Sequence, residues 1–318
     1  MTGSAPRAAE RGTLRRLGYH LLPGDSFSYV LHMRPREWPI MIAHTTLGFA
    51  LAQGISNSVH GVRFGSLVIG LAVWVVLLNG GTLAINSAFD RDEGDIGYLD
   101  APPPPPRHLA LFGFLLMVAG QAIALVLPSG FAIAYALCFA MSLLYSVPPV
   151  RLKAVAGADW LINMLGFGTL TAYAGWALTF LPLTRSGAWA LAGFAPLFAA
   201  LYPLTQLYQL EEDRARGDRT LALVLGVRAS LAVSIVATML AFLCFVRAML
   251  LSTAMRGGHS SAYAILAVAF AAWMAVLIPW IIRAPGLAPA AHKRGMYAAL
   301  AAWAITDLAV LLTANQVG

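Results

Sequence analysis

The segment SLVIGLAVWVVLLNGGTLAINSAF, residues 66–89, runs directly into the acidic segment DRDEGD, residues 90–95. The apolar part is long enough to cross a bilayer as a helix, because a membrane helix takes about 20 predominantly apolar residues. Carboxylates at the boundary of a bilayer are costly unless something binds them. The join at residue 90 therefore predicts a membrane helix that ends at a functional site.

A second acidic cluster, Gln209-Leu-Glu211-Glu212-Asp213, also follows a long apolar run. Together with Asp100 and Asp218, the two clusters contain nine of the fourteen carboxylates in the chain. Hard oxygen ligands at this density suit Mg²⁺, which commonly connects a few carboxylates to the phosphates of a substrate. The clusters thus point to chemistry on a diphosphate at a membrane surface.

The composition is that of an integral membrane protein. Hydrophobic residues make up 59% of the 318 residues and charged residues 11%, whereas a soluble domain has about 25% charged residues. A β-barrel fits poorly, because barrel strands are only about ten residues long and alternate in polarity. The net charge of +7 comes from basic residues scattered over loops, whereas proteins that bind nucleic acids cluster them. Cys138 and Cys244 lie in apolar runs and are expected to be buried filler residues.

We predict an all-α polytopic membrane protein, with nine transmembrane helices in one bundle over residues 37–318. A basic tail, residues 1–36, precedes it and lacks the features of a cleavable signal peptide. The turn signal Pro128-Ser-Gly130 should make an antiparallel hairpin of the third and fourth spans. The expected spans are about 38–57, 66–89, 108–127, 131–147, 159–181, 188–209, 228–252, 262–283 and 295–315.

The basic residues predict the orientation of these spans. With nine spans, seventeen of the 21 Lys and Arg residues fall on the side of the amino terminus. Lys and Arg accumulate on the cytoplasmic side of membrane proteins. We therefore expect the amino terminus, both acidic clusters and the two long polar loops on the cytoplasmic face.

Each acidic cluster has a spacing that suits a shared site. Asn86 and Asp90 are four residues apart and lie on one face of a helix, and Asp92 and Asp95 continue into the loop. Gln209, Glu212 and Asp213 are three and four residues apart at the end of the sixth span. Two such faces turned toward each other would hold Mg²⁺ against a leaving diphosphate. The alternative is that these are solvated charges and caps at helix ends.

The loop after the fourth span, Tyr145-Ser-Val-Pro-Pro-Val-Arg151-Leu-Lys153, carries two cations on the same expected side. Lys binds phosphate as a point charge and Arg as a bidentate fork. The alternative is that both residues only set the topology.

Three motifs in this order resemble the UbiA superfamily of intramembrane prenyltransferases. They are Asn86-x3-Asp90, Tyr145-Ser-x-Pro-x3-Leu-Lys153 and Glu212-Asp213-x3-Gly217-x2-Thr220-Leu221, and the Arg34-Pro35 pair precedes the first span. The resemblance implies a nine-helix bundle with a central cavity open sideways to lipid. It also implies a prenyl diphosphate bound through two Mg²⁺ ions, whose ionisation gives a carbocation that alkylates an acceptor.

The residues and the resemblance together give an expected site. Ser87 and Gly94 stand where the superfamily usually has Asp, and Gln209 where it often has Asp. These departures leave open whether Asp92 or Asp95 replaces the missing ligand. The expected catalytic residues are Asp90, Asp213 and Tyr145; the diphosphate-binding residues are Lys153, Arg151, Arg107 and Asn163; and the metal ligands are Asn86, Asp90, Asp95, Gln209, Glu212 and Asp213.

Aromatic residues are further candidates for the site, because the faces of their rings stabilise cations. The alternative is that they pack the bundle or face lipid. Asp307 lies inside the ninth span and could face the cavity or a polar partner. The aromatic candidates are Phe89, Tyr145, Phe167, Tyr173, Trp176, Tyr202 and Tyr208.

The function that we expect is Mg²⁺-dependent transfer of a prenyl group to a lipophilic acceptor in isoprenoid biosynthesis. A quinone precursor, another aromatic compound, a chlorin, a sugar or lipid headgroup and a carotenoid are all open as acceptors. A terpene cyclase of the same superfamily is the alternative, and the altered motifs motivate it. A transporter is less favoured, because transporters place ionisable groups near the middle of the membrane on broken helices.

Overall fold

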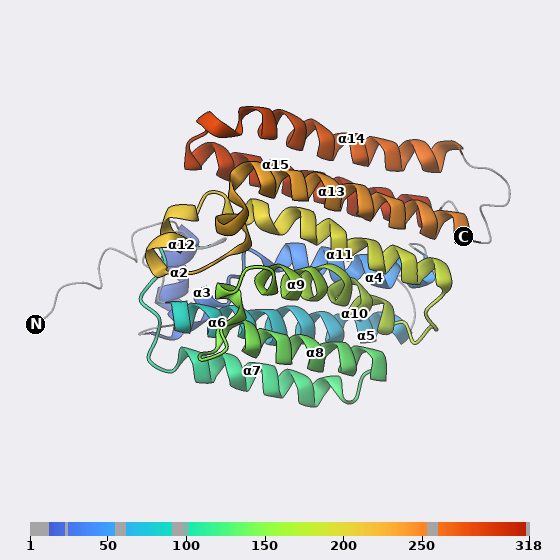
Figure 1. The fold of residues 1–318 in the computed structure, drawn as a ribbon. Coiled ribbons are helices and arrows are strands. Elements are labelled where there is room, and N and C mark those ends of the chain that lie inside the picture. Colours follow the sequence, from blue (N-terminus) through green and yellow to red (C-terminus); the bar gives the residue numbers. More distant parts are fainter. Residues whose placement is uncertain are drawn as a thin grey trace, which may run out of the picture. The chain divides into compact units, whose positions relative to one another are not determined.

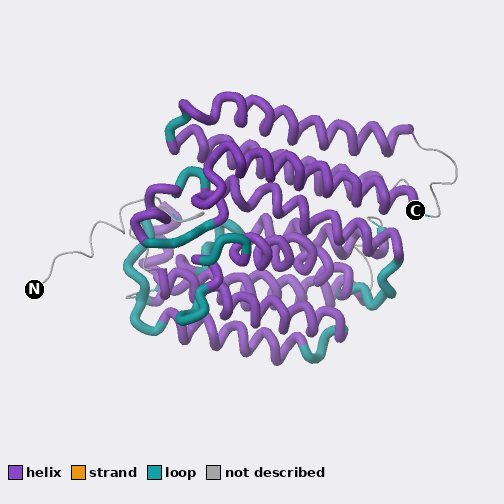
Figure 2. The backbone as a smooth tube through the Cα atoms, in the orientation of Figure 1, coloured by secondary structure: helices purple, strands orange, loops and turns teal. Residues whose placement is uncertain are grey.

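The computed structural model describes residues 13–22, 25–54, 62–90, 99, 101–252 and 260–315. Within these residues the regular elements are helices joined by loops and turns (Figure 2). The chain divides into two compact units. Unit 1 contains residues 1–43 and 69–150, and unit 2 contains residues 44–68 and 151–318.

Unit 1 is built around a hairpin of two antiparallel helices, α7 (Leu109–Ala124) and α8 (Ser129–Ser146), as the turn signal at Pro128 predicted (Figure 1). Both helices pack against α6 (Gly80–Asp90), which continues from the π-helical segment η1 (Ala72–Asn79). Gly81 on α6 and Gly113 on α7 allow these two helices to approach closely, since a Cβ on Gly113 would lie 2.6 Å from the carbonyl oxygen of Gly81. Two short helices, α2 (Thr13–Leu21) and α3 (Ser26–His32), complete this unit.

Unit 2 contains the longest helices of the chain, and α11 and α13 pack along each other (Figure 1). Gly226, with φ of 77°, interrupts α13 after its first turn. The elements are η2 (Leu152–Ala154), α9 (Ala158–Asn163), the π-helical η3 (Met164–Leu170), α10 (Thr171–Ala177), α11 (Arg185–Gln206), α12 (Leu210–Arg216), α13 (Leu221–Leu251), α14 (Ser260–Arg283), η5 (Ala284–Gly286) and α15 (Pro289–Asn315). Two further helices, α4 (Trp38–Gln53) and α5 (Val62–Leu71), each contain a boundary between the units.

Six helical stretches of the described residues are long and apolar enough to cross a membrane. Nine spans were expected, and the other three expected segments are helical but shorter or more polar. Two of them, α4 and α7, have 16 residues each. The third, residues 158–177, includes Asp159 and Asn163. The six stretches are Arg63–Asp90, Ser129–Ser146, Arg185–Gln206, Leu221–Leu251, Ser260–Arg283 and Pro289–Ala314.

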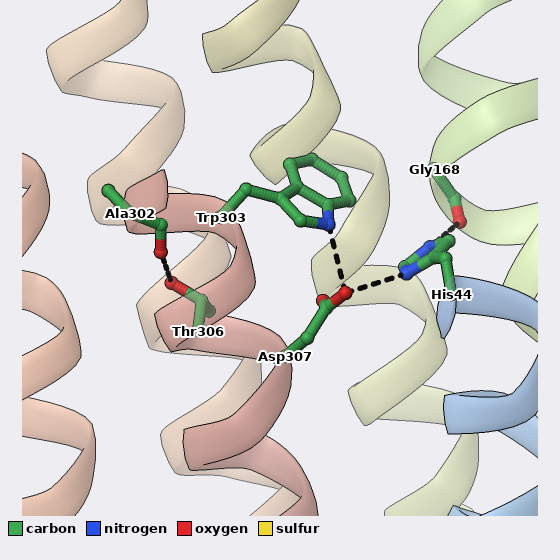
Figure 3. A network of polar contacts seen from close by, with 6 residues as sticks. All are labelled: His44, Gly168, Ala302, Trp303, Thr306 and Asp307. Carbon is green, nitrogen blue, oxygen red and sulfur yellow. Dashed lines mark hydrogen bonds and ion pairs between the residues drawn. The ribbon is translucent and has the colours of Figure 1, made fainter. Parts of the chain in front are cut away.

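A polar network lies inside unit 2 and shows what Asp307 faces (Figure 3). Asp307 on α15 accepts a hydrogen bond from the indole Nε1 of Trp303 at 3.1 Å, and its carboxylate lies 3.4 Å from Nδ1 of His44 on α4. The other ring nitrogen of His44 lies 3.0 Å from the carbonyl oxygen of Gly168. Because a carbonyl only accepts, Nε2 of His44 carries a proton. Asp307 therefore has polar partners, which the sequence had left open.

Candidate functional site

The first acidic motif lies on α6 in unit 1. Asn86 and Asp90 are one helical turn apart, both half-buried, and Asp90 is the last residue of the helix. This confirms that the two side chains share a helix face. Asp92 and Asp95 lie outside the described residues. Tyr145 is half-buried near the end of α8, and Arg107 is exposed in the loop before α7.

The proline-rich segment that follows this motif is anchored to the amino-terminal helices of unit 1. Nε2 of His32 on α3 lies 3.1 Å from the carbonyl oxygen of Pro103, and Nη2 of Arg15 on α2 donates to the carbonyl oxygen of Ala101 at 3.0 Å. Burial lowers the pKa of His32 to about 4. His32 is therefore neutral at physiological pH and donates its single ring proton to Pro103.

Residues 151–153, the end of the basic loop that belongs to unit 2, contact the residues that follow the second acidic motif. Nη1 of Arg151 lies 2.6 Å from Oδ1 of Asp218, and Arg151 has the left-handed φ of 38°. The backbone N–H of Arg219 donates to the carbonyl oxygen of Ala154 at 3.2 Å. Lys153, between these two contacts, is only 8% exposed. The contacts thus bring Arg151 and Lys153, two of the four diphosphate-binding candidates, close to the residues that follow the second motif.

Asp213 is the buried member of the second motif. Its side chain is 5% exposed on α12, whereas Glu211 and Glu212 are exposed. The hydroxyl of Thr220 donates to Oδ2 of Asp213 at 3.3 Å. The sixth span was expected to reach residue 209, but α11 ends at Gln206. Half-buried Gln209 instead precedes the separate short helix α12, so the motif is not the end of a membrane helix.

Asn163 is buried in the helical path of the fifth span, and its Nδ2 donates to the backbone carbonyl of Asp159 at 2.7 Å. Asp159 itself is fully buried and binds Gln206 and the start of α13. The sequence interpretation missed both Asp159 and Gln206. The available signal was a lone carboxylate two residues after Gly157, shortly after the basic loop.

Comparison with known proteins identifies the fold and the family. The model of the UbiA prenyltransferase family matches residues 41–301, which is most of the chain. The chain belongs to the UbiA prenyltransferase family. It is a multi-pass integral membrane protein and a UbiA-type prenyltransferase, which confirms the resemblance and the enzyme class. No curated protein matches the chain significantly.

Solved structures of UbiA homologs have the same fold. A homolog from Archaeoglobus fulgidus bound to GPP and Mg²⁺ has a TM-score of 0.67 at 18% identity, with 88% of this chain and 99% of that chain covered. A structure of a UbiA homolog from Archaeoglobus fulgidus bound to DMAPP and Mg²⁺ has a TM-score of 0.65 at 17% identity, with 90% of this chain and 99% of that chain covered. A structure of digeranylgeranylglyceryl phosphate synthase gives 0.66 at 14% identity, with 91% and 98% covered.

The donor chemistry of the UbiA motifs in this chain fits Mg²⁺. Asn86, Asp90 and Asp213 offer amide and carboxylate oxygens, which are the ligands that Mg²⁺ prefers. Among the residues that the structure describes, no group of three or more His, Cys, Asp and Glu side chains comes together. Mg²⁺ is usually held by one or two carboxylates together with the phosphate oxygens of a substrate.

Proposed function

We propose that this UbiA-type enzyme transfers a prenyl group from an allylic prenyl diphosphate to a lipophilic acceptor within the membrane. The observation that carries the proposal is the buried Asp213, which is held beside the end of the basic loop with Lys153. A carboxylate and a cation that are both withdrawn from solvent supply one group that can bind a metal ion and one that can bind phosphate oxygens. A diphosphate with its metal ions would engage both groups. The solved relatives that bind DMAPP or GPP with Mg²⁺ support this choice of substrate.

In this proposal the two motifs hold the metal and the basic residues hold the diphosphate. Two Mg²⁺ ions would supply the positive charge that stabilises the leaving diphosphate. Lys153 is the leading candidate for a phosphate contact, because it is a buried cation close to the residues that follow the second motif. The proposed metal ligands are Asn86, Asp90, Asp95, Gln209, Glu212 and Asp213, and the remaining proposed phosphate contacts are Arg151, Arg107 and Asn163.

The chemistry has a simple balance of atoms and electrons. The bond between the allylic carbon and the diphosphate oxygen breaks, and its electron pair leaves with the diphosphate. The allylic cation is then captured by the acceptor, which loses a proton as the new bond forms. Tyr145 is proposed to stabilise the cation with its ring face. We also propose that this site and the amino terminus face the cytoplasm, because basic residues predominate on that side.

Incubating the purified protein with Mg²⁺ and an allylic diphosphate tests this function. With a lipid extract as the source of acceptor, we expect a prenylated lipid in mass spectra, and none when Mg²⁺ is chelated. Without acceptor, release of a cyclic hydrocarbon would instead identify a terpene cyclase. Absence of both products over a range of prenyl lengths and extracts would contradict the proposal.

A further inference from the structure

The start of α13 is capped in an unusual way. The first N–H groups of a helix have no partner within the helix, and the side chain of the N-cap residue normally binds one of them. Thr220 is the N-cap residue of α13, but its hydroxyl makes no cap and donates to Oδ2 of Asp213 instead. Oδ2 of Asp159 accepts from the N–H of Leu221 at 3.1 Å, and Oε1 of Gln206 accepts from the N–H of Ala222 at 3.1 Å.

Asp159 and Gln206 are also hydrogen-bonded to each other at the start of α13. Nε2 of Gln206 donates to Oδ2 of Asp159 at 2.8 Å, and the N–H of Gly157 donates to Oδ1 at 2.9 Å. Both oxygens of a fully buried carboxylate are thereby bound. The orientation of the Gln206 amide follows, since only its nitrogen can donate to a carboxylate.

The start of α11 shows what a threonine does when it caps its own helix. Thr184 is the N-cap residue there, and its hydroxyl accepts from the N–H of Gly187 at 3.0 Å. At α13 this task is performed by Asp159 and Gln206, which lie 62 and 16 residues away from their backbone partners. Thr220 is therefore available to bind Asp213.

We propose that Asp159 and Gln206 are positioning residues that free Thr220 to hold Asp213 in place for Mg²⁺ and diphosphate. The inference rests on the proposed role of Asp213 as a metal ligand. Partners that orient a metal ligand commonly change metal affinity by about 10–100-fold when they are removed. A cap with a purely structural role would change only stability.

The two roles separate when Mg²⁺ affinity and stability are both measured without turnover. The melting temperature of the detergent-solubilised protein is followed against Mg²⁺ concentration, with a thiolo analogue of geranyl diphosphate that ionises slowly. Thr220→Val removes one hydrogen bond but no cap, so we expect the melting temperature without Mg²⁺ to fall less than in Asp159→Asn. The Mg²⁺ midpoint, which is the Mg²⁺ concentration at which half of the increase in melting temperature is reached, should rise by about tenfold. Asp159→Asn places an NH₂ group against donors, so it should lower the melting temperature and also raise the midpoint.

Matched controls complete the experiment. Thr184→Val removes a true cap, so it should lower the melting temperature and leave the Mg²⁺ midpoint at the wild-type value. Thr220→Ser keeps the hydroxyl and should also have the wild-type midpoint. Combining Asp159→Asn with Thr220→Val should raise the midpoint no further than Thr220→Val alone, because both act on one contact. Wild-type midpoints in Thr220→Val and Asp159→Asn would overturn the inference. A wild-type midpoint in Asp213→Ala would instead overturn the proposed function.

Discussion

At the scale of single residues, burial distinguishes Asp213 from its two acidic neighbours. Glu211 and Glu212 are exposed and solvated, whereas Asp213 is buried and bound by Thr220. We expect Asp213→Ala and Asp90→Ala to abolish turnover and to leave the protein folded in detergent, because each removes a proposed metal ligand. Product formation and size-exclusion profiles check this. Glu211→Ala is the matched control and should retain activity, and retained Mg²⁺-dependent turnover in both Asp variants would refute these roles.

Lys153 is the residue on which recognition of the diphosphate is expected to depend. Lys153→Ala removes a buried point charge, so the KM for the prenyl diphosphate should rise by about tenfold or more, which corresponds to one lost charged contact. Steady-state kinetics measure this effect. Arg185→Ala, which removes an exposed cation at the start of α11, should leave the KM unchanged. Equal kinetics for Lys153→Ala and the wild type would remove Lys153 from the site.

His32 makes the stability of the folded protein depend on pH. Its pKa is lowered from 6.5 to about 4 by burial, so between these values the unfolded chain holds more protons than the folded chain. The folded state therefore loses stability as the pH falls through this window, by about 2 kcal/mol at pH 5. Thermal unfolding at pH 7 and pH 5 measures the loss, which His32→Gln should reduce. An equal loss in both proteins would show that His32 is not responsible.

At the scale of elements, glycines set the distance between α4 and α10. A Cβ on Gly175 would lie 1.8 Å from the carbonyl oxygen of Thr45, and one on Gly48 would lie 1.7 Å from that of Ala172. Small residues allow such close approach of membrane helices. We expect Gly175→Ala to destabilise the protein by about 1–3 kcal/mol through overpacking. Gly65→Ala, on α5 with nothing within 4 Å of the new Cβ, is the control, and equal melting temperatures for both variants would contradict this packing.

The long apolar helices could be predicted from the sequence, but their ends and interruptions could not. Hydrophobic runs located α8, α11, α14 and α15 because burial in lipid imposes a length and a composition. The helical turn before Gly226 depends on hydrogen bonds to Asp159 and Gln206, which are distant from it in the sequence.

At the scale of the whole molecule, the family and the membrane class could be predicted from three motifs in order and from composition. The sequence also placed Asp213, Lys153 and Arg151 in one site, and unit 2 contains all three of them. Which acid of the second motif turns inward was not predictable, because α12 is a separate helix whose rotation depends on tertiary contacts. That both acidic motifs share one site is a proposal, since Asp90 belongs to unit 1 and Asp213 to unit 2.

Cross-linking between the two motifs tests this central proposal most directly. In a background with Cys138→Ala and Cys244→Ala, the pair Phe89→Cys and Glu211→Cys places one thiol next to each motif and keeps every proposed metal ligand. We expect a short bifunctional maleimide to link residues 89 and 211 efficiently when Mg²⁺ and the thiolo diphosphate are present, as peptide mass spectrometry would show. The pair Leu125→Cys and Glu211→Cys, with one thiol at the far end of α7, should stay unlinked. Equal, low cross-linking of both pairs in the folded protein would contradict a shared site.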